Sequence, residues 1–267
     1  MTRDSKTARP DPDRDELAFL ARYDAAEFPH PSLAVDVVLV TAHGGRLRAL
    51  LVRRDEHPAK GRWALPGGFV RLDESLEEAA ARVLREKAGL ADVFVEQLFT
   101  FGAVDRDPRT RVITVAYYAL VDHERLAAAN PGSGDSLVAV LDVPWSGVAG
   151  GAVRAQRTGG ESLALAFDHA IILGVAVERL RGKLDYAPIG FELLPAHFTL
   201  RQLQHVHETV LGHAVNKDSF RRRMLASGRV VATGQRERDA SHRPAELYRF
   251  EPNETDGRTL TPPAARR

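Results

Sequence analysis

Apolar and polar positions in the first half of the chain follow the pattern of β-strands. Ser32–Val40 (SLAVDVVLV) and Leu47–Arg54 (LRALLVRR) are rich in β-branched and aliphatic residues, and a Gly-Gly pair separates them. A second pair of predicted strands spans Val93–Gly102 and Arg111–Val121. Residues 105–109 (DRDPR) carry a proline and dense charge, which exclude a buried strand and predict a loop. The pattern therefore predicts a β-sheet in this part of the chain.

Further along, apolar residues recur with the period of an α-helix. In the segment 166–184 (AFDHAIILGVAVERLRGKL), Ile171, Ile172, Val175 and Leu180 fall on or near one face. The segment therefore predicts a helix with an apolar side.

The distribution of proline, glycine and charge divides the chain into parts. Residues 1–24 and 252–267 are charged and contain proline, so we expect them to be flexible tails. Residues 186–195 contain two prolines and one glycine, which predict a linker. A larger domain at 25–185 and a smaller one at 196–251 flank this linker.

Charge is divided unevenly between these two predicted domains. The 267 residues carry a formal net charge of only +1, yet His197–Phe250 holds ten Lys or Arg against five Asp or Glu. A basic segment on a slightly acidic body indicates an anionic partner for the smaller domain. The chain has no cysteine, no apolar run long enough to span a bilayer and a polar N-terminus. We therefore expect a cytoplasmic protein without a membrane partner.

The stretch 67–90 carries the strongest local signals in the chain. A Gly-Gly turn precedes a helix whose start is marked by Ser75 and Glu78, in a capping-box pattern. A glycine supplies the C-terminal stop of this helix. Glu74 and Arg82 are placed to form an ion pair between the loop and the helix.

This loop and helix resemble the Nudix box, whose pattern is Gly, five residues, Glu, seven residues, then Arg-Glu-apolar-x-Glu-Glu-x-Gly-apolar. The matching positions are Gly68, Glu74, Arg82, Leu84, Glu86, Gly89 and Leu90. In Nudix hydrolases, glutamates on one face of the helix gather Mg²⁺ or Mn²⁺ around a pyrophosphate. Here Val83 and Lys87 replace two of these glutamates. The resemblance therefore implies a domain with no catalytic residues, no metal site and no required cofactor, and Mg²⁺ is not expected to bind.

Residues around the box resemble the ADP-ribose-handling branch of Nudix proteins. The resemblance is carried by Glu96-Gln97-Leu98, Thr100-Phe101-Gly102 and the arginine-containing loop at 105–109. Guanidinium groups pair with phosphate oxygens, and aromatic rings stack on or flank an adenine. The residues expected to bind the effector are Arg53, Gly67, Gly68, Phe69, Glu86, Phe101, Arg106 and Arg109.

The basic C-terminal segment has the plan of a winged helix–turn–helix. Thr199 and Gln202 mark the start of one helix, a second helix follows at 217–227, and strands are expected at 230–233 and 246–250. The second helix carries three consecutive arginines and small residues, which suit the major groove of double-stranded DNA. The residues expected to contact DNA are Lys217, Ser219, Arg221, Arg222, Arg223 and Arg243.

The order of these parts resembles the NrtR family of Nudix-related transcriptional regulators. The resemblance covers Tyr23 to Phe250 and includes Phe167-Asp168-His169 and Phe220-Arg221-Arg222. It implies an α/β (α+β) chain, with a Nudix-type α/β/α sandwich domain followed by a small winged helix–turn–helix domain. It also implies a bacterial repressor of NAD biosynthesis or salvage genes, which ADP-ribose or a related NAD metabolite releases from DNA.

Two other functions stay open at this point. One is an ADP-ribose pyrophosphatase with an accessory C-terminal domain, which Val83 and Lys87 disfavour, although Glu77, Glu78 and Glu86 leave a weak metal site and residual hydrolysis open. The other is a regulator of sugar metabolism that senses a different phosphorylated compound. For a regulator, one winged helix offers too small a footprint for tight, specific binding. We therefore expect a homodimer on a palindromic operator, with contacts from the Nudix domains and the 166–184 helix.

Overall fold

The computed structural model describes residues 12–130, 134–237 and 244–253, and the chain divides into two compact units. The first unit, Met1–Pro31, contains helix α1 (Pro12–Leu20) and the 3-10 helix η1 (Ala25–Glu27). The Asp24 side chain caps η1 by accepting a hydrogen bond from the Ala26 N–H at 2.9 Å. The polar composition of residues 1–24 predicted a flexible tail and did not indicate helix α1.

The second unit, Ser32–Arg267, begins with a mixed β-sheet. Its strands follow the order β5-β6-β1-β2-β7-β8-β9, with β4 paired to β1 and β3 paired to β2. β1 and β6 run parallel, and the other pairings are antiparallel. The strands are β1 (Ser32–His43), β2 (Arg46–Arg53), β3 (Trp63–Ala64), β4 (Gly67–Phe69), β5 (Phe94–Phe101), β6 (Val112–Leu120), β7 (Ser136–Asp142), β8 (Arg154–Gln156) and β9 (Ser162–Leu163).

Helices cover both faces of this sheet. The apolar run of β1 is buried on both sides, since Val37 and Leu39 belong to one core and Val38 and Val40 to the other. Helix α2 packs into the first core and α4 into the second, which gives the α/β/α sandwich that the sequence predicted. The helices of this part are α2 (Leu76–Ala88), α3 (His123–Ala129) and α4 (His169–Lys183).

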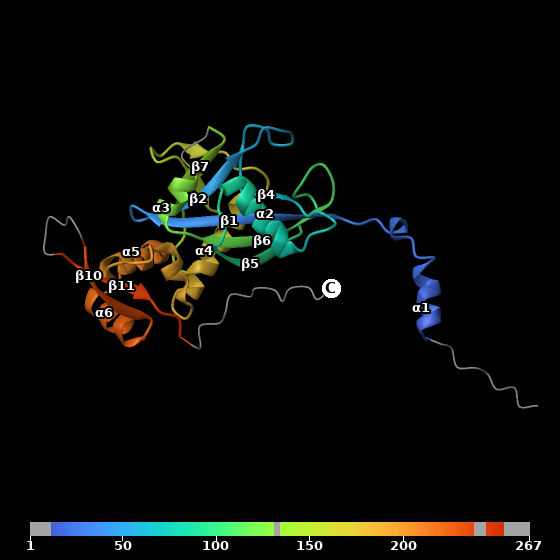
Figure 1. The fold of residues 1–267 in the computed structure, drawn as a ribbon. Coiled ribbons are helices and arrows are strands. Elements are labelled where there is room, and N and C mark those ends of the chain that lie inside the picture. The colour runs from blue at the N-terminus through green and yellow to red at the C-terminus, as the bar shows by residue number, and fades with distance from the viewer. Residues whose placement is uncertain (1–11, 131–133, 238–243, 254–267) are drawn as a thin grey trace, which may run out of the picture. The chain divides into compact units, whose positions relative to one another are not determined.

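The C-terminal part is a winged helix, also as predicted; its elements lie at one end of the sheet, beside α4 (Figure 1). Thr199 and Gln202 form a reciprocal capping box, and Gly212 ends the first helix with a left-handed φ of 77°. Phe220 and Tyr248 meet in a small core that joins the helices to the hairpin. The elements are η2 (Pro188–Leu193), α5 (Leu200–Leu211), α6 (Lys217–Ala226), β10 (Val230–Arg236) and β11 (Glu246–Phe250).

The connection between the sheet and the winged helix is structured. The 3-10 helix η2 lies within the predicted linker, and its Ile189 and Leu193 side chains are buried. They share the core under α4 with Val206 and Val210 of α5. A common hydrophobic core, and not a free length of chain, therefore joins the two parts.

Arg181 near the end of α4 adds polar contacts to this junction. Its buried guanidinium donates to the carbonyl oxygens of Val210, Trp145 and Gly147 at 2.9, 3.2 and 2.9 Å. It also lies 4.8 Å from the centre of the Trp145 ring. Because Val210 is in the last turn of α5, the cation sits where the helix dipole favours positive charge.

The helices and strands differ from the sequence prediction in two respects. In α4, Ile172 and Leu180 are buried but Ile171 is 52% exposed, because neighbouring residues on a helix point about 100° apart. The short helix α3 and the short strands β8 and β9 were not predicted. Within the described part of the chain, no helix has the length and apolar character that crossing a membrane requires.

Candidate functional site

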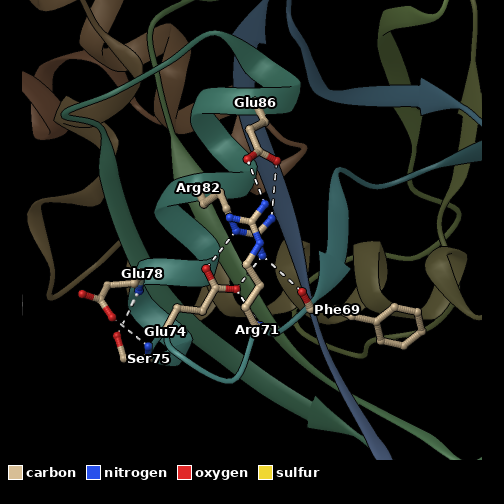
Figure 2. A network of polar contacts seen from close by, with 7 residues as sticks. All are labelled: Phe69, Arg71, Glu74, Ser75, Glu78, Arg82 and Glu86. Carbon is tan, nitrogen blue, oxygen red and sulfur yellow. Dashed lines mark hydrogen bonds and ion pairs between the residues drawn. The ribbon is translucent and has the colours of Figure 1, made fainter.

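Helix α2 begins at a capping box and carries a network of polar contacts (Figure 2). The Glu78 N–H donates to the Ser75 hydroxyl at 3.2 Å, and the Ser75 N–H donates to the Glu78 carboxylate at 2.7 Å. The expected ion pair is also present, because Arg82 donates to the two Glu74 oxygens at 2.8 and 2.6 Å. These bonds hold the pKa of Glu74 down at about 2. The loop before α2 is thereby fixed to the helix.

Arg82 also contacts the opposite side of the loop. It donates to the Phe69 carbonyl at 3.1 Å and to Glu86 at 3.4 Å, and Arg71 lies 3.6 Å from Glu86. The Phe69 carbonyl points toward the guanidinium while its ring extends away from the network (Figure 2). The Glu86 carboxylate therefore has two arginine neighbours.

A pocket of about 620 Å³ lies beside this network, within the size range of small-molecule sites. Phe101 is not among its lining residues. Its side chain is 9% exposed and packs in the core beneath α4, so we leave it out of the site. The predicted effector residues that do line the pocket are Arg53, Gly67, Gly68, Phe69, Glu86, Arg106 and Arg109.

One wall of the pocket is a buried group of charged side chains. Arg106 donates to both oxygens of Asp168 at 2.9 and 2.7 Å and lies 3.6 Å from Asp36. His169 accepts a hydrogen bond from the Leu65 N–H at its Nδ1, at 2.8 Å, and its Nε2 lies 3.8 Å from Asp36. Burial lowers the pKa of His169, so the ring is neutral with its proton on Nε2. The Arg106 guanidinium is thus already held by carboxylates of the chain.

Asp36 was not predicted as a site residue, although the sequence holds a signal for it. It is the one acidic residue inside the apolar run of β1, and it is 8% exposed. The backbone at Gly67 passes so close that an added Cβ would lie 2.3 Å from an Asp36 oxygen. Glycine is therefore required at position 67 by the approach of this carboxylate.

Arg109 is also paired within the pocket lining. Its guanidinium donates to both oxygens of Asp107 at 3.0 and 2.7 Å, and it lies 5.4 Å from the centre of the Phe69 ring. These hydrogen bonds lower the pKa of Asp107. Arg54 lies 5.0 Å from the centre of the Phe167 ring, another lining residue that was not predicted. Only the folded chain brings Phe167 beside Arg54 at the end of β2.

The α2 side chains at and near the metal-binding positions of the Nudix box have other surroundings here. Val83 is buried in the core, and Lys87 lines the pocket with a cationic group. Glu77 accepts a hydrogen bond from the Tyr117 hydroxyl at 3.4 Å, and Glu78 belongs to the capping box. The described ranges contain no group of three or more His, Cys, Asp or Glu residues able to hold a metal ion.

The second candidate site is the outer surface of α6. Phe220 anchors this helix in the winged-helix core and is 3% exposed. Asn216 caps its start by accepting a hydrogen bond from the Ser219 N–H at 3.0 Å. The side chains that the structure places on the exposed surface are Lys217, Ser219, Arg221, Arg222 and Arg223.

The three arginines of α6 differ in their surroundings. Arg221 interacts with the Tyr248 hydroxyl of β11, and Arg223 lies 3.9 Å from Asp185. Arg222 forms no ion pair with any residue in the ranges that the structure describes. Arg243, the predicted contact at the tip of the wing, lies outside the described residues.

Comparison with known proteins finds two sequence families in this chain. Residues 30–152 match the NUDIX domain, and residues 190–250 match the NrtR DNA-binding winged helix domain. A relative from Acinetobacter baylyi, the ADPR responsive transcriptional repressor NtrR, is 39% identical over 237 residues, which are 88% of this chain and 88% of the relative.

Solved structures match over the same two parts. Shewanella oneidensis NrtR, crystallised with a 27mer DNA, is 36% identical with a TM-score of 0.69, and the match covers 82% of this chain and 93% of that one. A MutT/nudix family protein from Enterococcus faecalis is 28% identical with a TM-score of 0.69, over 90% of this chain and 98% of its own. The similarity therefore extends from the sheet through the winged helix.

Proposed function

The chain belongs to the NrtR family of transcriptional regulators, and on that premise we propose that it is an ADP-ribose-responsive repressor. In this proposal, α6 enters the major groove of double-stranded DNA and ADP-ribose binds in the pocket beside α2. Residues 25–185 form the sensing domain and residues 196–251 the DNA-binding domain. Binding of the ligand releases the DNA.

The observation that carries the proposal is the arrangement of α6. Its apolar anchor, Phe220, is buried, while Lys217, Ser219, Arg222 and Arg223 are exposed on a helix packed at the base of a hairpin. Arginine reads guanine edges with two hydrogen bonds, and lysine neutralises phosphates. A relative of matching length is named as a repressor, which supports DNA as the partner.

The pocket has the features that a nucleotide diphosphate needs. Gly68 allows the backbone to approach a ligand closely, and Phe69 offers a ring that is 46% exposed. Arg53 is exposed at the end of β2 and supplies positive charge to the same cavity. Adenosine and the terminal ribose each have polar edges that the surrounding carboxylates and carbonyls can bind.

Helix α4 offers a physical connection between the two sites. Its first turn begins beside Asp168, which binds Arg106 of the pocket, and its last turn holds Arg181, which binds the Val210 carbonyl of α5. A ligand that prefers one position of this helix changes the population of DNA-competent molecules. We propose that ADP-ribose acts through this rigid element.

We further propose that the sensing domain does not hydrolyse its ligand. Val83 and Lys87 replace two carboxylates of the box, and the remaining glutamates of α2 bind Arg82, Arg71, Ser75 or Tyr117. A ligand that is bound without being consumed suits a sensor, because its occupancy then follows the concentration of the metabolite.

The operator and the assembly complete the proposal. Two copies of the chain form a homodimer, so that two α6 helices reach successive major grooves about 34–36 Å apart on a palindromic site. The regulated genes are those of NAD synthesis or salvage. Their products consume or renew the pool from which ADP-ribose arises.

The test uses a DNA duplex that the full-length protein selects from a random-sequence library. Fluorescence anisotropy should show tight binding of that duplex and its release when ADP-ribose is added. A parallel incubation with Mg²⁺ or Mn²⁺ should leave ADP-ribose intact by chromatography. Failure to select a palindromic duplex, or robust metal-dependent hydrolysis, would contradict the proposal.

A further inference from the structure

Lys87 is a cation in the pocket for which the described part of the chain supplies no counter-ion. It lies on α2, is exposed, and lines the cavity together with Glu86 and the Gly67-Gly68 turn. Its ammonium forms no ion pair with any residue of the described ranges. The one carboxylate next to it in sequence, Glu86, faces Arg82 at 3.4 Å and Arg71 at 3.6 Å.

Unlike Lys87, the arginines expected to bind phosphate are paired with carboxylates of the chain. Arg106 is 5% exposed at its side chain and is held by Asp168 and Asp36, and Arg109 is held by Asp107. Each guanidinium would have to give up a carboxylate before it could pair with a phosphate through two hydrogen bonds. The positive charge available to an incoming diphosphate therefore comes from other cations. One of them is Lys87, on the helix of the Nudix box.

We propose that Lys87 binds the diphosphate of the ligand directly and that binding needs no divalent cation. The inference rests on the proposed function, because it concerns how the same pocket holds ADP-ribose. A lysine ammonium is a compact point charge with three donors, and it can contact oxygens of both phosphates. The ammonium thus supplies positive charge to the diphosphate, while Val83 one turn earlier carries no charge and the neighbouring Glu86 faces Arg82 and Arg71.

The contribution of Lys87 is specific to the diphosphate part of the ligand. Lys87 contributes to the affinity for ADP-ribose and not to the affinity for adenosine, which carries no phosphate. Its loss should weaken ADP-ribose binding about 10- to 100-fold, the range for a hydrogen bond to a charged group. Lys87→Arg keeps the charge and should retain most of the affinity.

Isothermal titration calorimetry of the full-length protein tests this, with ADP-ribose and adenosine as probes and with either EDTA or Mg²⁺ in the buffer. We expect wild-type protein to bind ADP-ribose equally in both buffers and Lys87→Gln to bind it about 10- to 100-fold more weakly. Arg85→Gln is the matched control, because Arg85 is an exposed cation on the same helix that does not line the pocket. Circular dichroism checks that each variant is folded.

The outcomes distinguish this inference from the proposed function. If wild-type protein binds in EDTA and Lys87→Gln binds equally well, the lysine does not hold the ligand, although the sensor proposal stands. Loss of wild-type binding in EDTA, or equal weakening by Arg85→Gln, also overturns the inference. If wild-type protein binds ADP-ribose in neither buffer, the sensing function itself is wrong and the role of Lys87 falls with it.

Discussion

Arginine residues near the pocket and arginine residues on α6 have opposite surroundings. Arg82, Arg106 and Arg109 each make their shortest ion-pair contact with a carboxylate of the chain at 2.6 or 2.7 Å. On α6, Arg223 has only a 3.9 Å contact with an exposed aspartate, and Arg222 has no ion pair among the described residues. The residue type is the same, but pairing decides whether the charge stabilises the fold or is available to a partner.

The first region is fixed before any ligand arrives. Bidentate ion pairs fix the loop before α2 and the pocket wall that contains Asp36 and Asp168. The arginines of these pairs already bind carboxylates, so their guanidinium groups are not available to a ligand. The second region keeps its charge in water, where a polyanion can replace the surrounding counter-ions. Substitutions in the two regions should therefore affect different measurements.

The largest effect is expected from Arg106→Ala. Asp36 and Asp168, whose side chains are 11% and 15% exposed, would lose their shared guanidinium, and removing one partner of a buried ion pair costs about 3–5 kcal/mol. Urea unfolding should show this loss of stability. Arg85→Ala, at an exposed position on α2, should change the free energy of unfolding by no more than about 0.5 kcal/mol. Equal free energies of unfolding for the two variants would contradict the claim that the ion pairs of Arg106 stabilise the fold.

Arg222→Ala and Arg223→Ala should show the converse behaviour. Each is expected to cost about 1–3 kcal/mol of operator binding if the side chain reads a base, with unfolding unchanged. Fluorescence anisotropy with the selected duplex measures the affinity, and Arg85→Ala again serves as the control. A double variant that stays folded and binds the operator with wild-type affinity would show that α6 is not the recognition helix.

Acidification should weaken the network of α2 through Glu74. Hydrogen bonds from Arg82 lower the pKa of this carboxyl from 4.5 to about 2, so its ionised form stabilises the fold above pH 4.5. This stabilisation is lost as the pH falls from 4.5 toward 2, because the Glu74 carboxylate of the folded protein is then protonated as well. Unfolding of Glu74→Gln should accordingly depend less on pH in this window than wild-type unfolding does. The exposed Glu124 provides the control, since Glu124→Gln should leave the wild-type pH dependence in place.

The smallest effect is expected from Lys217→Ala at the start of α6. A lysine that contacts phosphate weakens binding to all sequences alike when it is removed, and it lowers the salt slope of log K by about 1. Titrations of the selected and a scrambled duplex at several salt concentrations measure both quantities. A change confined to the selected duplex would instead make Lys217 a base-reading residue.

Local signals in the sequence predicted the elements well. Both capping boxes, the Glu74–Arg82 pair and the helix–helix–hairpin order were confirmed, because each depends on residues close together in the chain or on strict periodicity. The features that the sequence did not indicate are long-range. Phe101 has the right residue type for an adenine site, but a register shift between Gln97 and Phe99 of β5 lets its side chain join Leu98 in the core beneath α4.

Pairing of charges was likewise hidden from the sequence. Arg106 and Asp168 are far apart along the chain, and nothing in either segment indicates that they bind each other. Asp36 was recognisable as a charge in an apolar strand, yet its partners came only from the folded chain. Sequence therefore located the arginine-containing loop, whereas the folded structure showed that Arg106 and Arg109 are paired and that Arg222 has no ion pair among the described residues.

The core shared by η2, α5 and the sheet limits how such a regulator can be rebuilt. Val206 and Val210 complete the apolar layer under α4, so a sensor cut off after residue 185 would leave that layer open to water. A chimaera that exchanges the DNA-reading part for another must keep this face of α5 and replace only α6 and the hairpin. The boundary for recombination thus runs through the winged helix itself, and new operator specificities can evolve on α6 without disturbing the surface that holds it to its sensor.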